Sequence, residues 1–288
     1  MQHIVNVAGM TIGGEGLPVL IAGPCVIENR ESATQIAAFL KDLTDELQVP
    51  FVFKTSYDKA NRTALKSYRG PGLSKGLEII SGIKSKLDIP VISDVHRFSE
   101  IEPAAQVLDI IQIPAFMCRQ TDFVVAVSET GKPVNIKKGQ FLAPWDVEHI
   151  VEKVISTGND QVLLTERGSS FGYNNLVVDF RSLHIMRRLG RPVIFDATHS
   201  VQLPGGAGCT SGGQREFVPM MARAAMAAGV DGIFLEVHPN PDKALCDGPN
   251  SVSLQQLRPL LEQLLAIKKV CHKTHHNMSP KEVSCYRC

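Results

Sequence analysis

Residues 193–199, VIFDATH, carry the pattern on which the fold depends: an unbroken apolar run that ends in polar residues. Continuous apolar runs are typical of parallel strands that are buried on both faces. The pattern occurs eight times, and a loop with an amphipathic stretch of about 10–15 residues follows most runs. The runs are Val19–Cys25, Phe51–Lys54, Val91–Asp94, Ile110–Pro114, Val134–Lys137, Val162–Arg167, Val193–His199 and Gly232–His238. This alternation predicts an α/β protein, a closed (β/α)₈ TIM barrel rather than an open sheet.

The segments between the runs have helical spacing. In Glu31–Leu47, the apolar residues Ile36, Leu40 and Leu43 fall on one helical face. Four further segments are expected to be helical: Trp145–Ser156, Phe180–Leu189, Gln214–Ala228 and Leu254–Val270.

The two ends of the chain lie outside this repeat. Residues 3–14 are interpreted as a short N-terminal β-hairpin that plugs one end of the barrel. We therefore predict one barrel domain over residues 1–270 and a polar tail over residues 271–288. The Cys285-x-x-Cys288 pair in that tail is interpreted as incidental.

Composition excludes several functional classes. The chain has 288 residues, of which 44% are hydrophobic, and its net charge is +1. It contains no long charged block, so neither nucleic acid nor a membrane is an expected partner. No apolar run reaches the roughly 18–20 residues of a membrane span, and the first residues do not resemble a signal peptide. An odd number of cysteines, seven, argues against a disulfide framework and for a reducing, cytoplasmic location.

Polar residues end all eight runs. The active site of a TIM barrel lies at the carboxyl ends of its strands. A single polar residue there could simply face solvent, but eight beside buried-type sequence favour a binding site. These residues are Cys25, Lys54, Asp94, Gln112, Lys137, Arg167, His199 and Glu236.

Two kinds of chemistry are present among these residues. Cys25, His199 and Glu236, with Asp247 on the loop after the last run, offer one thiolate, one imidazole and two carboxylates. This mixture suits a divalent metal such as Zn²⁺, Fe²⁺ or Mn²⁺. The second group is cationic and suits phosphate or carboxylate. Its members are Lys54, Lys59, Lys137 and Arg167.

Several glycine-rich stretches are expected to form loops over the barrel mouth, since none of them matches a nucleotide-binding fingerprint. They are residues 70–72, 168–172 and 205–208.

A set of motifs resembles the 3-deoxy-D-manno-octulosonate 8-phosphate synthases, also called 2-dehydro-3-deoxyphosphooctonate aldolases, from about residue 19 to residue 265. The most specific is residues 58–63, DKANRT, followed by residues 68–72, YRGPG. The others are DVH at 94–96, QIPAF at 112–116, RQTD at 119–122, NIKK at 135–138, FGY at 171–173, DATHS at 196–200 and CDGP at 246–249.

The resemblance implies condensation of phosphoenolpyruvate with D-arabinose 5-phosphate and water, a transferase step toward lipopolysaccharide. It also implies a homotetramer. The residues that it places on phosphoenolpyruvate are Lys54, Lys59, Ala115, Lys137, Gln140 and Arg167. Those that it places on the aldose phosphate are Asn61, Arg62, Asp94 and, from a neighbouring subunit, Arg119. The residues expected to act in catalysis are Lys59, Asp94, Lys137, His199 and Asp247.

The family has metal-dependent and metal-free forms. Cys25 occupies a position that is asparagine in metal-free members, so it resembles the metal-dependent form. The CDGP motif at 246–249 resembles the metal-free form instead.

Two other functions are weighed against this one. A sibling synthase that uses erythrose 4-phosphate shares the barrel, but carries a Lys-Pro-Arg type motif where this chain has Lys59-Ala60-Asn61-Arg62. A non-catalytic barrel that senses a metabolite or a metal would have lost ligands or cations, and here every expected position is filled.

Overall fold

The computed structural model describes residues 3–206 and 211–275, and the expected TIM barrel is confirmed. Each barrel strand pairs in parallel with its neighbours, and β11 pairs with β14, which closes the sheet. The barrel strands are β3 (Val19–Gly23), β4 (Phe51–Lys54), β5 (Val91–Asp94), β6 (Ile110–Ile113), β7 (Val134–Lys137), β8 (Val162–Glu166), β11 (Val193–Asp196) and β14 (Gly232–His238).

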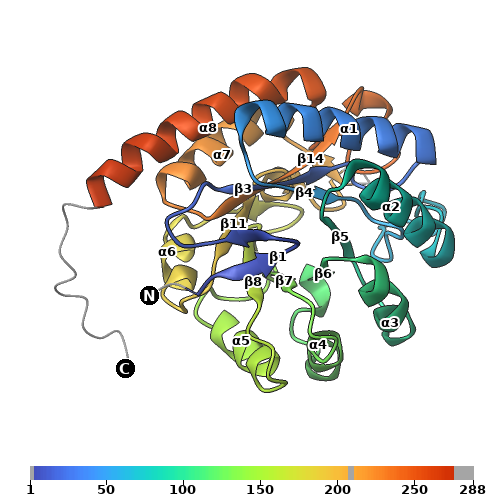
Figure 1. Ribbon diagram of the computed structural model, residues 1–288, viewed down its shortest axis with the longest axis horizontal. Helices are drawn as coiled ribbons and strands as arrows, with labels where there is room; N and C mark the ends of the chain where they lie inside the picture. The colour runs from blue at the N-terminus through green and yellow to red at the C-terminus, as the bar shows by residue number, and fades with distance from the viewer. Residues whose placement is uncertain (1–2, 207–210, 276–288) are drawn as a thin grey trace.

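One helix follows each barrel strand, and the helices form a ring around the sheet (Figure 1). The five expected helical segments are found, and α2, α3 and α4 occur in addition. The helices are α1 (Arg30–Leu47), α2 (Leu73–Leu87), α3 (Phe98–Val107), α4 (Thr121–Ser128), α5 (Val147–Ile155), α6 (Arg181–Arg187), α7 (Val218–Ala227) and α8 (Leu254–His275). None of the helices in the described part of the chain is long and apolar enough to cross a membrane.

The core has two layers. Residues between the outer faces of the strands and the helices form the larger one, which includes Leu20, Phe53 and Leu235. The smaller one lies inside the barrel and includes Ile21, Val52, Ile92 and Phe234.

The expected N-terminal hairpin closes one end of this inner core. It consists of β1 (Val5–Val7) and β2 (Met10–Ile12), which pair antiparallel. Val5, Val7 and Ile12 are buried against the inner barrel residues. The hairpin covers the amino-terminal ends of the barrel strands, and Figure 1 shows β1 in front of the sheet. The carboxyl ends of the strands are therefore left open for a site.

Four strands, β3, β6, β8 and β11, end earlier than expected. Cys25, Arg167 and His199 therefore lie just after β3, β8 and β11. The strand β3 stops before Pro24, which has no N–H to donate. After β11, the N–H of His199 donates instead to Asp196 Oδ1 at 2.9 Å. The strand β6 likewise stops at Ile113, before Pro114.

Gly23, at the end of β3, is required by close packing of two backbones. A Cβ atom there would lie 1.9 Å from the carbonyl oxygen of Lys54 on β4. The absence of a side chain thus lets the strand pair that carries Cys25 and Lys54 approach closely.

The loops after the strands carry short elements. They are β9 (Ser169–Ser170), β10 (Leu176–Val177), β12 (Gln202–Leu203), β13 (Gly212–Gly213), β15 (Val252–Ser253), η1 (Ala115–Met117), η2 (His199–Val201), η3 (Arg215–Phe217) and η4 (Pro241–Lys243). The glycine-rich stretches at 70–72, 168–172 and 205–206 lie on these strand-to-helix connections, at the carboxyl end of the barrel.

The helix α8 continues through His275, and its last residues belong to the segment expected as a polar tail from residue 271. The Cys285-x-x-Cys288 pair lies outside the described residues.

Candidate active site

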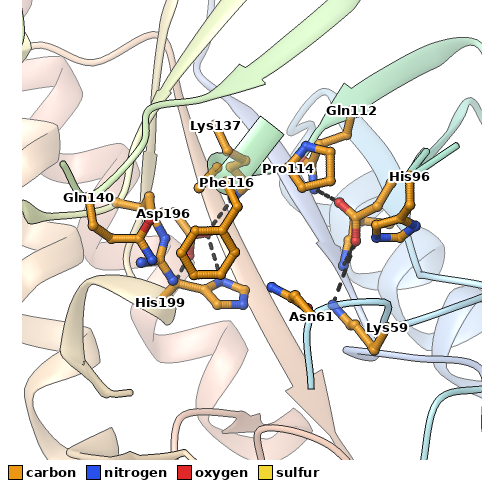
Figure 2. A pocket seen from close by; sticks show the side chains of 14 residues that line it. Lys59, Asn61, His96, Gln112, Pro114, Phe116, Lys137, Gln140, Asp196 and His199 are labelled. Carbon is orange, nitrogen blue, oxygen red and sulfur yellow. Dashed lines mark hydrogen bonds and ion pairs between the residues drawn. The ribbon is translucent and has the colours of Figure 1, made fainter. Parts of the chain in front are cut away.

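Four cations converge at the carboxyl end of the barrel. Lys54 and Lys137 are the last residues of β4 and β7, Arg167 follows β8, and Lys59 lies on the loop after β4. All four are at most 8% exposed, and they line one cavity (Figure 2). Buried cations need negative partners or a bound anion.

Asp94, at the end of β5, supplies one of these negative partners. Its Oδ2 accepts a hydrogen bond from Ser56 Oγ at 2.6 Å and lies 3.8 Å from Lys54 Nζ and 3.7 Å from Lys59 Nζ. Burial alone would raise the pKa of Asp94, but the two lysines outweigh it and hold this pKa well below its usual value. Asp94 is therefore a fixed negative charge in the cavity wall.

Asp196, at the end of β11, links a lysine to a histidine. Lys137 Nζ pairs with Asp196 Oδ2, and His199 Nδ1 lies 2.7 Å from the same oxygen. Burial lowers the pKa of Lys137 to about 8, although Asp196 opposes this shift. The Nζ of Lys137 also lies 3.4 Å from the centre of the Phe234 ring. Lys137 is thus positioned by a carboxylate and an aromatic face, with a pKa close to neutral.

The four expected metal donors meet at Asp247. Its Oδ2 lies 3.5 Å from Cys25 Sγ and 3.6 Å from His199 Nε2, and that nitrogen lies 3.5 Å from Glu236 Oε1. Two ligands of one tetrahedral metal lie about 3.3–3.8 Å apart, given metal–ligand distances of about 2.0–2.3 Å. Each of these contacting pairs has the spacing of two ligands on one divalent metal. The donors form two groups that share Asp247, with Cys25 in one group and His199 and Glu236 in the other.

Asp196 completes this arrangement because it binds the other ring nitrogen of His199. A carboxylate in this position orients a metal-binding histidine and leaves Nε2 free for the ion.

Several buried polar atoms of the site lack a hydrogen-bond partner among the described residues. Buried polar groups are normally paired, so unpaired atoms around a cavity indicate where a ligand binds. They are Arg167 Nη1, Arg62 Nε, Gln140 Oε1, His96 Nδ1 and Glu236 Oε2.

Two adjoining cavities make up the site. The first is lined by Lys54, Lys137 and Asp94, and the second by Arg62, Cys246 and Asp247. Both cavities are also lined by the same six residues: Lys59, Asn61, Phe116, Gln140, Arg167 and His199. The site therefore consists of two spaces lined by cationic side chains, with a common wall.

The remaining expected residues fall in different places. Ala115, at the start of η1, lines the first cavity. Arg119 is exposed and lines neither cavity. Its expected role concerns a neighbouring subunit and stays a prediction.

Sequence reasoning missed three residues of the site as individual participants. Asp196 directly follows the apolar residues of its run, which is a usable signal for a site residue, but the sequence pattern places the end of that run at His199. His96 lines the first cavity, and burial lowers its pKa. Cys246 contacts Cys25, a contact over 221 positions that no local pattern reveals.

Comparison with known proteins agrees with this geometry. A family model described as the DAHP synthetase I family matches residues 2–273. Three curated relatives bear the name 2-dehydro-3-deoxyphosphooctonate aldolase. The one from Desulfosudis oleivorans is 65% identical over 270 residues, which cover 93% of this chain and 97% of the relative. The one from Desulfatibacillum aliphaticivorans is 63% identical over 257 residues, which cover 89% of this chain and 94% of the relative. The one from Geobacter sulfurreducens is 59% identical over 270 residues, which cover 94% of this chain and 99% of the relative.

Proposed function

The chain belongs to the DAHP synthetase I family, and we propose that it condenses phosphoenolpyruvate with D-arabinose 5-phosphate and water. The products are 3-deoxy-D-manno-octulosonate 8-phosphate and inorganic phosphate, for lipopolysaccharide synthesis. The observation that carries this proposal is the pair of cationic cavities that share Lys59, Arg167 and His199. A reaction between two phosphorylated substrates needs two such spaces side by side.

Phosphoenolpyruvate occupies the first cavity. Lys54, Lys59, Lys137 and Arg167 neutralise its phosphate and carboxylate groups, and the unpaired Nη1 of Arg167 donates to one of them. Gln140 and the backbone at Ala115 complete this side of the site.

The aldose phosphate occupies the second cavity. Asn61 and Arg62 line it, and they bind the phosphate end of the sugar. Arg119 is exposed, which supports a homotetramer in which this residue reaches the site of a neighbouring subunit.

The enzyme works in the cytoplasm. Cys25, Cys118 and Cys246 are free thiols, which supports a reducing compartment.

The reaction forms a carbon–carbon bond and releases phosphate. Carbon 3 of phosphoenolpyruvate attacks the aldehyde carbon, whose oxygen gains a proton. Water adds at carbon 2, and phosphate leaves with cleavage of the carbon–oxygen bond. Holding two substrates in adjoining cavities supplies up to about 7–11 kcal/mol of the barrier reduction when the reacting atoms are aligned. Lys137 and Arg167 stabilise the charge on the phosphoenolpyruvate side, and Asp94 faces the aldehyde end.

Cys25, His199, Glu236 and Asp247 would hold a divalent metal. Such an ion supplies Lewis-acid activation of the aldehyde or of a water molecule. The support for this part of the proposal is the donor spacing around Asp247 and the fixed orientation of His199 by Asp196.

The competing function is the sibling reaction, in which erythrose 4-phosphate gives 3-deoxy-D-arabino-heptulosonate 7-phosphate (DAHP). The matching family model is named after this sibling synthase. Asn61 and Arg62 line the second cavity and belong to the Lys59-Ala60-Asn61-Arg62 motif, which resembles the enzymes that use the pentose. The two functions differ only in the aldose that this cavity accepts.

The deciding experiment is phosphate release from phosphoenolpyruvate with each aldose, with and without chelator. We expect release with arabinose 5-phosphate, its loss on chelation and its recovery with added divalent metal. Faster release with erythrose 4-phosphate would overturn the choice of substrate. Release that persists after complete removal of metal would overturn the metal requirement and leave the condensation intact.

A further inference from the structure

Cys246 lies in the metal-binding region although the four-donor set does not use it. It follows η4, is 3% exposed, and its Sγ lies 2.7 Å from Cys25 Sγ. It also accepts a hydrogen bond from Arg62 Nη1 at 2.8 Å. A cysteine that serves only as a small apolar side chain packs against carbon atoms. Cys246 packs in a small cluster with Val26 and Tyr68, but its sulfur also faces a thiol and a guanidinium.

The possible donors form two groups that share Asp247. His199, Glu236 and Asp247 form one, and Cys25, Cys246 and Asp247 form the other. In each group the donor atoms lie within 4.8 Å of one another. The thiol group is thus as compact as the group that contains the histidine.

Cationic side chains surround the sulfur of Cys246. Its Sγ accepts a hydrogen bond from the charged Arg62 and is in contact with Cys25 Sγ. Arg62 also lies 3.8 Å from Asp247 Oδ1, so its charge is shared between the sulfur and the carboxylate. Lys59 lines the same cavity. A second sulfur donor at this position would therefore lie beside two cationic side chains.

We propose that Cys246 is a second thiolate ligand of the metal, beside Cys25 and Asp247. This inference rests on the metal site of the proposed function and deepens it. When the ion binds, both thiols lose their protons to solvent and two metal–sulfur bonds form, without electron transfer.

The required movement is small. Two sulfurs on one tetrahedral ion lie about 3.7 Å apart, given a metal–sulfur distance of about 2.3 Å. The two Sγ atoms, which lie 2.7 Å apart, must therefore separate by about 1 Å.

The consequence is metal selectivity. Soft thiolate ligands favour Zn²⁺ over Mn²⁺, and a pair of thiolates does so more than one. The chain would thus prefer a thiophilic metal because of a residue in its CDGP motif.

The test is titration of the full-length, metal-stripped protein with Co²⁺ and Cd²⁺, without substrates. Absorbance from sulfur-to-metal charge transfer grows with the number of bound thiolates. We expect about half the absorbance per bound ion in both Cys246→Ser and Cys25→Ser. We also expect Cys246→Ser to bind Cd²⁺ at least about 10-fold more weakly, with a smaller loss for Mn²⁺. Cys118→Ser, at a buried cysteine that lines neither cavity, should match the parent.

The outcomes separate the two proposals. If Cys246→Ser keeps the full absorbance and Cd²⁺ affinity of the parent, Cys246 is not a ligand, and the four-donor site stands. If the parent itself binds neither ion, the metal site of the proposed function fails as well. Cys246→Ala provides the same comparison if the serine variant does not fold.

Discussion

Replacement of Asp196 by asparagine tests how the site controls Lys137 and His199 together. Asp196 is fully buried, and its carboxylate pairs with Lys137 and contacts His199 Nδ1 at 2.7 Å. Asparagine keeps the shape and removes the charge. Loss of one partner of a buried ion pair costs about 3–5 kcal/mol. If most of that loss falls on substrate binding and the transition state, kcat/KM for phosphoenolpyruvate should fall by about 100-fold or more.

The pH profile gives the sharper readout. Lys137 is charged below its pKa of about 8, so kcat/KM for phosphoenolpyruvate should fall as pH rises through that value. Without Asp196, burial lowers the pKa further, and the fall should begin at a lower pH. The assay is initial-rate phosphate release across the neutral and alkaline range.

A control separates this effect from general destabilisation. Asp109→Asn removes a carboxylate that pairs with Lys84 at 2.7 Å, just before β6 and away from the mouth. It should keep the parent's pH profile. If the Asp196→Asn profile also superimposes on the parent's, Asp196 does not control the charge of Lys137.

Three further perturbations follow from the fold and the site. Gly23→Ala should prevent folding or sharply lower Tm, since its Cβ would meet the Lys54 carbonyl oxygen at 1.9 Å. As a control, Gly82→Ala inside α2 should stabilise the folded protein by about 0.5–1 kcal/mol. Equal Tm values for the two variants would refute the packing argument. Ile12→Ala in the hairpin should cost about 2–5 kcal/mol in urea unfolding and leave kcat unchanged, because the site lies at the other end of the barrel; a selective loss of kcat would contradict this. Arg119→Ala should raise KM for the aldose phosphate by about 10-fold without a change in Tm, and an unchanged KM would remove Arg119 from the site.

The sequence was most informative about the strands and least informative about contacts between them. The run Val134–Lys137 predicted β7 to the residue, because a doubly buried strand is apolar throughout and its end is marked by a charge. Local patterns could not reveal that Lys137 pairs with Asp196 two strands away, since barrel closure sets that contact. The helices α2 to α4 were not singled out, and α8 extends past Val270 to His275.

The placement of the site residues depended on motifs more than on periodicity. Asn61 and Arg62 lie on a loop whose sequence has no helical or strand pattern, so only the resemblance indicated them. Cys246 was recognised as part of a motif, but its neighbour Cys25 comes from the other end of the chain. Which side chain faces which is a property of the closed barrel.

The pairing of β3 with β14 has a consequence for biosynthesis. It joins Val19 to Gly232, so the first and last barrel strands meet only after almost the whole chain has left the ribosome. A nascent chain that stops before β14 has Cys25 but lacks Glu236, Cys246 and Asp247. Contacts of such long sequence separation form late. A chain that is still being synthesised therefore cannot assemble the set of donors proposed for the metal.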